Sequence, residues 1–468
     1  MKKDRRIWVG LAGAFMVLVL FLAFAPLTFA QGTTKSSQYG LIFDEMMRFI
    51  KSYYIDDVDE KTLFEGAMKG MFDAIGDPHS VFMTEQEMSA ASDSAMGQFG
   101  GVGLYISKFS GDAATFDEDR LPYVRVVAPI EDTPAYRLGI KAGDYIIKVD
   151  GKTTESMTLD EAAKLMRGKP GTTVSITFLR DKDIVFTYDI ERANIEVPSV
   201  KSDLIEKNIG YLRITQFAAN TPEKVKEALD SFSKKKIKYL VIDLRSNPGG
   251  VLESAVEIAD YFLSEGVIVS TKSKIPSWNQ VYNASKKVRL PKSVPIAVLI
   301  DRGSASAAEI LSAALSDNGR AVLIGETTYG KGSVQQLRSL GKDGFKLTMG
   351  KYYTPKDINI DKVGIPPEKE VKDRELTDEE KAAYKKLIEE YRIQKFVSDN
   401  PNPSDLQVDT FIQQLKSDGI VMEDRILRKL IRNEVNFANL NSPVYDLEFD
   451  VVLQEAVRML KSGEIKAK

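Results

Sequence analysis

The chain has 468 residues, a formal net charge of −3 and 28% charged residues, a composition ordinary for a soluble protein of several domains. This balance offers no basic footprint for nucleic acid, so no nucleic-acid partner is expected. One histidine and no cysteine remove the usual zinc and iron ligand sets and exclude a cysteine nucleophile. We therefore expect no cofactor and no metal, although a purely carboxylate metal site stays open.

Residues 1–30 have the pattern of an export signal. Residues 1–6 are basic, residues 7–29 are almost wholly apolar, and Ala30 is a small residue at the expected cleavage point. Because the apolar run approaches the length that spans a bilayer, it is either a cleaved signal peptide or a transmembrane anchor. In both cases the remaining chain would be exported to the periplasm or another extracytoplasmic location.

Two amphipathic helices are expected in a helical region over residues 38–95. Apolar residues recur at helical spacing and are interrupted by the acidic segment 55–59. A lone helical pair cannot bury both of its faces, so it should pack on another domain or another subunit. The Gly-Asp-Pro-His-Ser sequence at residues 76–80 predicts a turn that holds the only histidine, His79, which we interpret as structural.

A small β-rich domain is predicted over residues 97–194. The Asp-Gly pair at residues 150–151 is typical of a hairpin turn, and residues 109–121 form an acidic insertion between strands. Residues 100–106 are expected to form a glycine turn that leads into an alternating strand. Alternating and β-branched runs predict further strands at 123–127, 145–149 and 173–178, the last strand of the domain, with a short helix at 159–166.

From residue 195 to about residue 370 strands alternate with helices, which is typical of an α/β sheet. A glycine loop at residues 247–250 precedes one helix and lacks the motifs of nucleotide-binding loops, so an oxyanion contact suits it better. Loops at the carboxyl ends of such strands converge on the usual site of an open sheet. The expected strands of this one sheet are 210–215, 239–244, 267–270, 296–300 and 321–324, with helices at 222–234 and 253–263.

Ser306 is predicted to stand at the N-terminus of a helix. It ends the sequence Gly-Ser-Ala-Ser, which lies between the strand at 296–300 and a helical pattern at 307–315. Unpaired backbone amides and the positive end of the helix dipole stabilise negative charge that develops beside a hydroxyl there. Ser304 and Ser306 could also be ordinary N-caps.

A serine nucleophile needs a base, and the composition limits the choice. A Ser-His-Asp triad would have to recruit His79 from far upstream. The remaining candidate is Lys331, whose flanking glycines let backbone and substrate approach closely. A lysine is a base only when neutral, so burial would have to lower its pKa. A solvated loop lysine is the alternative.

Four motifs, taken in order, resemble the C-terminal processing (tail-specific) peptidases, which are serine proteases with a Ser-Lys dyad. The resemblance covers roughly residues 38–370 and implies a multidomain α+β fold. Its parts would be a helical N-terminal segment, a PDZ-like β domain, an α/β peptidase core with a mixed sheet over residues 195–370, and a helical C-terminal region over residues 371–468. The motifs are Gly-Ser-Ala-Ser-Ala-Ala-Glu-Ile (303–310), Gly-Glu-Thr-Thr-Tyr-Gly-Lys-Gly-Ser-Val-Gln-Gln (325–336), Tyr-Tyr-Thr-Pro (352–355) and Gly-Ile-Pro-Pro (364–367).

The resemblance also implies the catalytic residues. Ser306 would be the nucleophile, Lys331 the general base and Gln335 the residue that orients the lysine. The backbone amides of Gly250 and Ala307 would form the oxyanion hole. If the chain from Lys331 to Gln335 is extended, residues four apart point to the same face, and the glutamine can reach the amine.

Residues 134–151 resemble a PDZ domain, which implies recognition of a peptide's C-terminal carboxylate by a glycine-rich turn and pairing of the peptide with the next strand. Arg167 matches an arginine that couples this domain to the protease site, with a solvated helix-end arginine as the alternative. A purely structural β domain also stays open. The implied peptide-binding residues are Gly101, Val102, Gly103, Leu104 and Ile106.

The hypothesis is a serine endopeptidase that binds the non-polar C-terminal tails of exported proteins, with free carboxyl ends, and cleaves those proteins. Two other classes stay open, namely a PDZ scaffold with an inert peptidase domain and an α/β binding or acyl-transfer protein. The charged helical tail and the N-terminal helices carry apolar stripes with no obvious core of their own. We therefore expect these two regions to form the interface of a homo-oligomer, such as a dimer.

Overall fold

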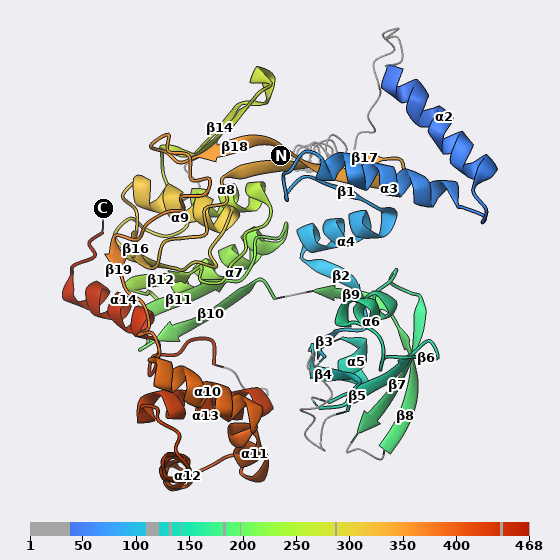
Figure 1. The fold of residues 1–468 in the computed structure, drawn as a ribbon. Coiled ribbons are helices and arrows are strands. Elements are labelled where there is room, and N and C mark those ends of the chain that lie inside the picture. Colours follow the sequence, from blue (N-terminus) through green and yellow to red (C-terminus); the bar gives the residue numbers. More distant parts are fainter. Residues whose placement is uncertain are drawn as a thin grey trace, which may run out of the picture.

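A computed structural model describes residues 38–108, 121–130, 133–141, 143–180, 184–196, 198–285, 288–439 and 443–467. Four parts follow one another along the chain: N-terminal helices, a β-rich part, an α/β part and C-terminal helices (Figure 1). The predicted fold class is therefore confirmed. The predicted export signal and nearly all of the acidic insertion lie outside the described residues.

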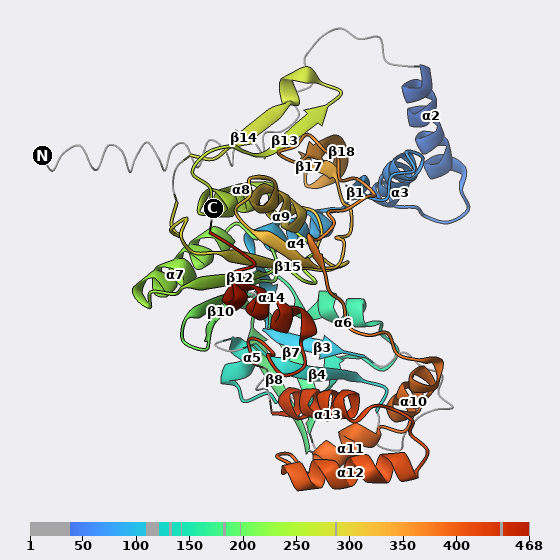
Figure 2. The same cartoon turned by 90° about the vertical axis from the view of Figure 1, so that its left-hand side faces the viewer.

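The N-terminal helices include the predicted pair. Asp59 caps the second helix, because its carboxylate accepts the amide of Thr62 at 2.9 Å. The first helix has no buried residue and projects from the rest of the molecule (Figures 1 and 2). The second packs on the α/β part, where the rings of Phe72 and Phe345 lie 5.6 Å apart. The elements are α2 (Gln38–Tyr53), α3 (Glu60–Asp73), β1 (Val81–Met83) and α4 (Glu85–Met96).

The β-rich part is built on a sheet with the order β3-β4-β5-β7-β8, and β6 pairs with β5. The prediction that the strand at 173–178 is the last one is wrong. β8 pairs with β7 along its whole length, and β9 returns to pair with β2. β8 begins with two exposed apolar residues, which breaks the alternation that marks a half-buried strand. The elements are β2 (Gln98–Gly101), β3 (Leu104–Ser107), β4 (Val124–Pro129), α5 (Pro134–Arg137), β5 (Tyr145–Val149), β6 (Lys152–Thr153), α6 (Leu159–Met166), β7 (Thr173–Arg180), β8 (Ile184–Glu191) and β9 (Ala193–Glu196).

The α/β part has a six-stranded sheet with the order β10-β11-β12-β15-β16-β19, parallel except for β10. Successive side chains point to opposite faces, so Leu212 packs with α7, α8 and α9 while Tyr211 packs with α14. The strands are β10 (Val200–Ile205), β11 (Ile209–Ile214), β12 (Tyr239–Asp243), β15 (Ile296–Ile300), β16 (Val322–Gly325) and β19 (Lys369–Glu370), and the helices are α7 (Thr221–Lys234), α8 (Leu252–Asp260) and α9 (Ala307–Asp317).

A second, antiparallel sheet stands beside this one, with the order β1-β18-β13-β14 and β17 paired to β18. The prediction that residues 267–270 belong to the main sheet is wrong, because β13 pairs with β14 and β18. A short apolar run predicts a strand but does not choose its neighbours. The elements are β13 (Val267–Ser273), η2 (Pro276–Trp278), β14 (Gln280–Asn283), β17 (Ser333–Leu340) and β18 (Asp343–Tyr353).

Most of the C-terminal helices bury a core of their own, which corrects the expectation that this region lacks one. Leu387, Phe411, Leu415 and Leu427 lie in this core, away from the sheets. The last helix instead covers one face of the main sheet. None of the helices that the structure describes is long and apolar enough to cross a bilayer. The elements are α10 (Asp378–Glu389), α11 (Arg392–Asp399), α12 (Asp405–Ser417), α13 (Asp424–Ala438) and α14 (Val451–Ser462).

Candidate active site

Ser306 lies where β15 turns into α9, as predicted. Its side chain and backbone are only 7% exposed, and its φ of 55° is a strained value for a residue that carries a Cβ. Ser304 has a different role, because its hydroxyl donates a hydrogen bond to the carbonyl of Leu244 at 2.8 Å and connects the turn to the end of β12. The first serine of the motif is therefore a structural residue, whereas the second stands strained at the helix N-terminus.

Two backbone amides next to Ser306 have no acceptor within the part of the chain that the structure describes. Ala307 opens α9, so its N–H has no partner in the helix. The Gly250 N–H points away from its neighbours, because Phe217 pairs with the residues on either side of it. Gly249 holds this loop against the nucleophile, since a Cβ there would lie 2.7 Å from the Ser306 Cβ. The two amides predicted to form the oxyanion hole are thus free to donate hydrogen bonds to an oxyanion.

Glu309 joins the serine turn to the lysine loop. One of its oxygens, Oε2, accepts the backbone amides of both Ser306 (2.8 Å) and Lys331 (2.9 Å). The other oxygen accepts the Thr328 hydroxyl at 2.5 Å and the Gly330 amide at 2.8 Å. Glu309 is 0% exposed, and a buried carboxylate is tolerated only with such a set of donors. This one side chain therefore holds the candidate nucleophile and the candidate base next to each other.

Lys331 is half-buried, and burial lowers the pKa of its ammonium group, as a general base requires. The nearby charge of Lys346 also lowers this pKa, while Asp77 and Glu309 raise it. No hydrogen bond joins Lys331 Nζ to Ser306 Oγ in the described structure. Such contacts are often long in an enzyme without substrate and shorten when substrate binds.

Gln335 lies on β17, but the chain from Lys331 to Gln335 is not the continuous strand that the sequence suggested. β17 begins at Ser333, and its pairing with β18 shifts between Val334 and Gln335. The Gln335 amide nitrogen donates to Ser333 Oγ at 2.8 Å and to Thr348 Oγ1 at 3.1 Å. Because Nε2 has both of its acceptors, the carbonyl oxygen Oε1 is left as the atom that can accept a lysine hydrogen.

The predicted peptide-binding residues lie together at one corner of the β-rich part. Gly103 has a φ of 85°, and a Cβ there would lie 2.2 Å from Thr133, so only glycine fits this turn. Arg167 ends α6, and its guanidinium lies over the Phe99 ring at 5.3 Å, beside the same turn. The structure gives no contact between Arg167 and the candidate dyad. The remaining residues are Gly101 and Val102, which lead into the turn, and the half-buried Leu104 and Ile106 on β3.

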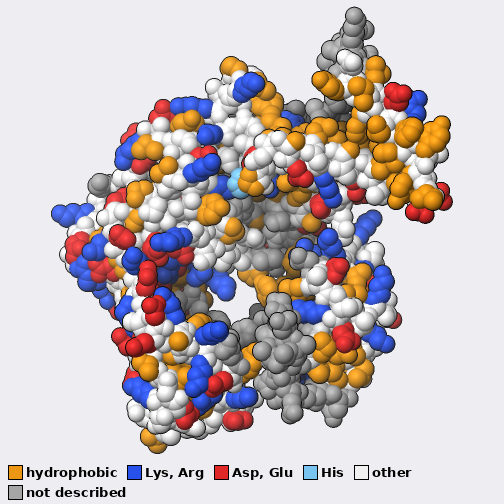
Figure 3. Space-filling view, viewed as in Figure 1, with side chains coloured by type: hydrophobic (Ala, Val, Ile, Leu, Met, Phe, Trp, Pro, Cys, Tyr) orange, Lys and Arg blue, Asp and Glu red, His pale blue; other side chains and the backbone are white. Residues whose placement is uncertain are grey.

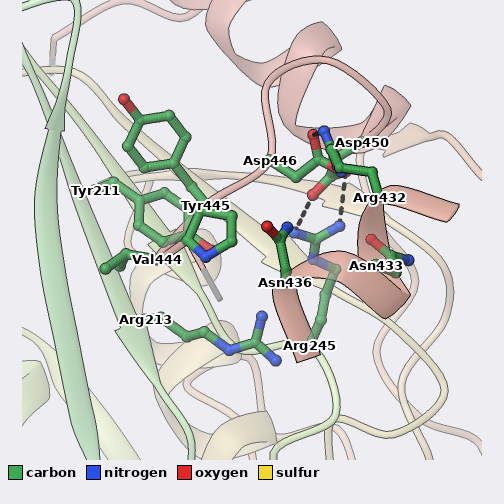
Figure 4. Close-up of a pocket in the computed structure, with 11 residues that line it drawn as sticks. Tyr211, Arg213, Arg245, Arg432, Asn433, Asn436, Val444, Tyr445, Asp446 and Asp450 are labelled. Atoms are coloured by element: carbon green, nitrogen blue, oxygen red, sulfur yellow. Dashed lines mark hydrogen bonds and ion pairs between the residues drawn. The ribbon is translucent and has the colours of Figure 1, made fainter. Parts of the chain in front are cut away.

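Arg245, which precedes the loop that carries Gly250, belongs to a partly buried ionic cluster with Asp243 and Asp450. Figure 4 shows Arg245 and Asp450 in this cluster. Arg245 Nε and Nη2 donate to Asp243 at 3.0 and 2.6 Å, and Nη1 and Nη2 donate to Asp450 at 2.9 and 2.5 Å. Asp243 is 0% exposed, and burial alone would raise its pKa. The hydrogen bonds and charges of Arg245, Tyr211 and Arg213 together outweigh burial, so the pKa is lowered. Arg245 and Asp450 line a cavity of about 340 Å³ between the main sheet, α13 and α14.

The sequence predicted the candidate reacting groups but not the residues that hold them in place. Glu309 could have been found, because Ser306 and Glu309 match a capping box and an acid inside an apolar helix needs partners. Thr328 and Thr348 gave no comparable signal. Their role depends on which loops and strands come together in space.

Comparison with known proteins identifies the domains and the family of the chain. The peptidase family S41 model matches residues 208–371, the PDZ domain model matches residues 125–180, and the model of the activating protease CtpB N-terminal domain matches residues 31–87. The carboxy-terminal-processing protease of Bartonella bacilliformis is 38% identical over 370 residues, which cover 76% of this chain and 81% of the relative. The carboxy-terminal processing protease CtpA of Bacillus subtilis is 36% identical over 337 residues, 72% of this chain and 69% of the relative.

A solved structure of a photosystem II D1 C-terminal processing protease aligns with 71% of this chain and 92% of its own chain, at 25% identity and a TM-score of 0.42. The sequence identity to the Bartonella bacilliformis and Bacillus subtilis relatives extends over most of the chain. It places the chain in the class of serine-type carboxy-terminal processing peptidases with a PDZ domain. The chain belongs to peptidase family S41.

Proposed function

We propose that this peptidase cleaves exported proteins with Ser306 as nucleophile and Lys331 as general base, after its PDZ domain has bound their non-polar C-terminal tails. Neutral Lys331 takes the proton of Ser306 as the hydroxyl attacks the scissile carbonyl, and it later gives a proton to the leaving amine. The amides of Gly250 and Ala307 stabilise the oxyanion, and Gln335 holds the lysine. Each oxyanion donor contributes about 10²–10³ in rate.

The single observation that carries the assignment is the Glu309 carboxylate oxygen shared by the Ser306 and Lys331 amides. It fixes a strained serine, with two free amides beside it, next to a half-buried lysine of lowered pKa. This is the set of groups that acyl transfer by a Ser-Lys dyad needs.

Recognition of an apolar tail is supported by the form of the PDZ turn. Gly103 brings the backbone of the turn close to Thr133, and Leu104 and Ile106 follow on β3. A free carboxylate would take the amides of the turn, and an extended tail would pair with β3. Arg167, beside the turn, is proposed to transmit tail binding to the dyad.

Export is proposed from the amino-terminal sequence, with residues 7–29 either removed with the signal or kept as a membrane anchor. Assembly into a homo-oligomer is proposed from α2. Leu41, Phe49 and Tyr53 are exposed on this helix, and Ile55 follows it. They belong to an apolar surface on α2 and α3 (Figure 3), and surfaces of this kind bind partners. We assign a second copy of the chain as the partner, and light scattering that shows a monomer would refute this.

The test of function is degradation of an unstructured reporter that ends in a short apolar tail. The wild type should degrade it, Ser306→Ala and Lys331→Ala should not, and amidation of the tail carboxylate should slow the wild type. Ser304→Ala is the matched control for the serine, because its hydroxyl bonds to Leu244 and not to the reacting groups. Activity that survives Lys331→Ala would overturn the assignment of the base.

A further inference from the structure

The turn at residues 77–80 reaches the candidate active site from the N-terminal helices. β1 and β13 share one edge of β18, where they pair with residues 344–346 and 350–353. Between these two partners the amide of Thr348 faces no strand, and it donates to Ser80 Oγ at 3.0 Å. Ser80 is buried, so the turn fills the gap between two strands.

A continuous hydrogen-bonded path passes through this gap. On the N-terminal side, Ser80 Oγ donates to Asp77 Oδ2 at 2.6 Å, and the His79 amide donates to Asp77 Oδ1 at 3.0 Å. On the other side, Thr348 Oγ1 accepts from Gln335 Nε2 at 3.1 Å. Asp77 is thus connected through Ser80 and Thr348 to the side-chain amide of Gln335, which is proposed to hold Lys331.

Asp77 also acts on Lys331 through its charge. The hydrogen bonds of Ser80 and Thr348 lower the pKa of Asp77 to about 2, so its carboxylate is ionised at neutral pH. Four influences meet at the Lys331 amine: burial and Lys346 lower its pKa, while Asp77 and Glu309 raise it. Asp77 reaches the lysine from the N-terminal turn, Glu309 from α9 and Lys346 from β18.

We propose that Asp77 is a positioning residue for the general base, because it fixes the Gln335 amide through Ser80 and Thr348 and attracts the Lys331 ammonium group through the charge of its carboxylate. The N-terminal helical region, in which this turn lies between α3 and β1, thereby becomes part of the support of the active site. This inference rests on the proposed function of Lys331 and Gln335.

The test is the pH dependence of kcat/KM, measured on the apolar-tailed reporter. Asp77→Asn keeps the size of the side chain and removes its charge, so the acid limb of the profile should move to lower pH while kcat falls about tenfold or more. Ser80→Ala and Thr348→Val break the path but keep the charge, so kcat should fall at unchanged KM with a smaller displacement of the limb. Asp73→Asn is the matched control, because it removes an exposed carboxylate at the end of α3.

A purely structural turn gives a different result. All three variants would then melt at lower temperature, while the acid limb and the kcat per folded molecule would equal those of Asp73→Asn, and the proposal would be overturned. If Asp77→Asn does not fold, the test rests on Ser80→Ala and Thr348→Val. An unchanged kcat in both of these variants would also overturn the proposal. A failure of the proposed function would look different, because Ser306→Ala or Lys331→Ala would then retain activity.

Discussion

Arg245 and Asp450 form a bidentate ion pair, with contacts of 2.9 and 2.5 Å, between the base of the loop that carries Gly250 and the first residue before α14. The two residues lie 205 positions apart in sequence, so the C-terminal end of the chain supports a loop of the candidate active site. Among the described residues, Arg245 is the cation nearest to the buried Asp243, at 2.6 Å, whereas Arg213 lies 3.9 Å away. A shift of the C-terminal segment would therefore move Arg245 and the loop that follows it.

Asp450→Asn should lower kcat about tenfold at nearly unchanged KM, because a charge-assisted hydrogen bond contributes about 1.5 kcal/mol. Asparagine still caps α14, whose Leu453 amide bonds to this side chain, so the helix should persist. Asp446→Asn is the matched control, since Asp446 lines the same cavity but pairs with Arg432. Equal losses in both variants would refute a specific support of the oxyanion loop.

Activity should rise with pH through the pKa of Lys331, because only the neutral amine accepts a proton. Burial lowers this pKa below the ordinary lysine value of 10.5, so the acid limb should lie below that pH. Lys346→Met removes a cation that lowers the pKa further, so the limb should move to higher pH. Lys342→Met, which removes an exposed lysine on the hairpin before β18, should leave the limb in place. If the acid limb of Lys346→Met stays in place or moves to lower pH, the assignment of Lys331 as the general base is contradicted.

Gly250→Ala should reduce kcat by about 10²–10³, the effect of losing one oxyanion donor. A Cβ at this position would lie 2.1 Å from the Phe217 carbonyl oxygen, and the φ of 144° is strained for alanine, so the loop must shift. Tail-peptide binding, measured by fluorescence anisotropy, should be unchanged. Gly66→Ala in α3 is the control, because a Cβ there meets no atom within 4 Å. Full activity of Gly250→Ala would remove this amide from the mechanism.

Glu309→Gln should reduce kcat about 10²-fold and destabilise the fold by about 1–3 kcal/mol. The amide has the same shape, but its NH₂ group must face backbone or hydroxyl donors that now lack an acceptor. Labelling of Ser306 by a serine-reactive fluorophosphonate should fall together with peptide cleavage, because both loops lose the same anchor. Labelling at the wild-type rate would contradict this anchoring role, because the reagent reacts only with a serine that its base activates.

The helix at 159–166 and the strand at 145–149 were predicted to the residue, because each has a cap or turn signal and a clear apolar period. The strand at 267–270 was found but placed in the wrong sheet, since pairing depends on distant residues that local periodicity does not contain. Core formation by the C-terminal helices was missed for the same reason, as their apolar stripes face one another and not a sheet.

At the candidate site, the motifs located the serine, the lysine and both amides, because each motif is a continuous segment with a recognisable turn. The residues that hold these groups together come from elsewhere. Thr348 and Ser80 meet only because two strands leave a gap on the edge of β18. Asp450 meets Arg245 only because α14 returns to the main sheet.

The divided edge of β18 has a consequence for shortened forms of this protein. A chain that began after β1 would uncover the backbone of residues 344–346 in addition to the Thr348 amide. Backbone groups that now bond to β1 and Ser80 would then form one uninterrupted bare edge beside the lysine loop. Extended peptides pair readily with such an edge, so a truncated enzyme would acquire an unselective docking strand of its own. Its choice of substrates would then reflect that new strand as much as the PDZ domain.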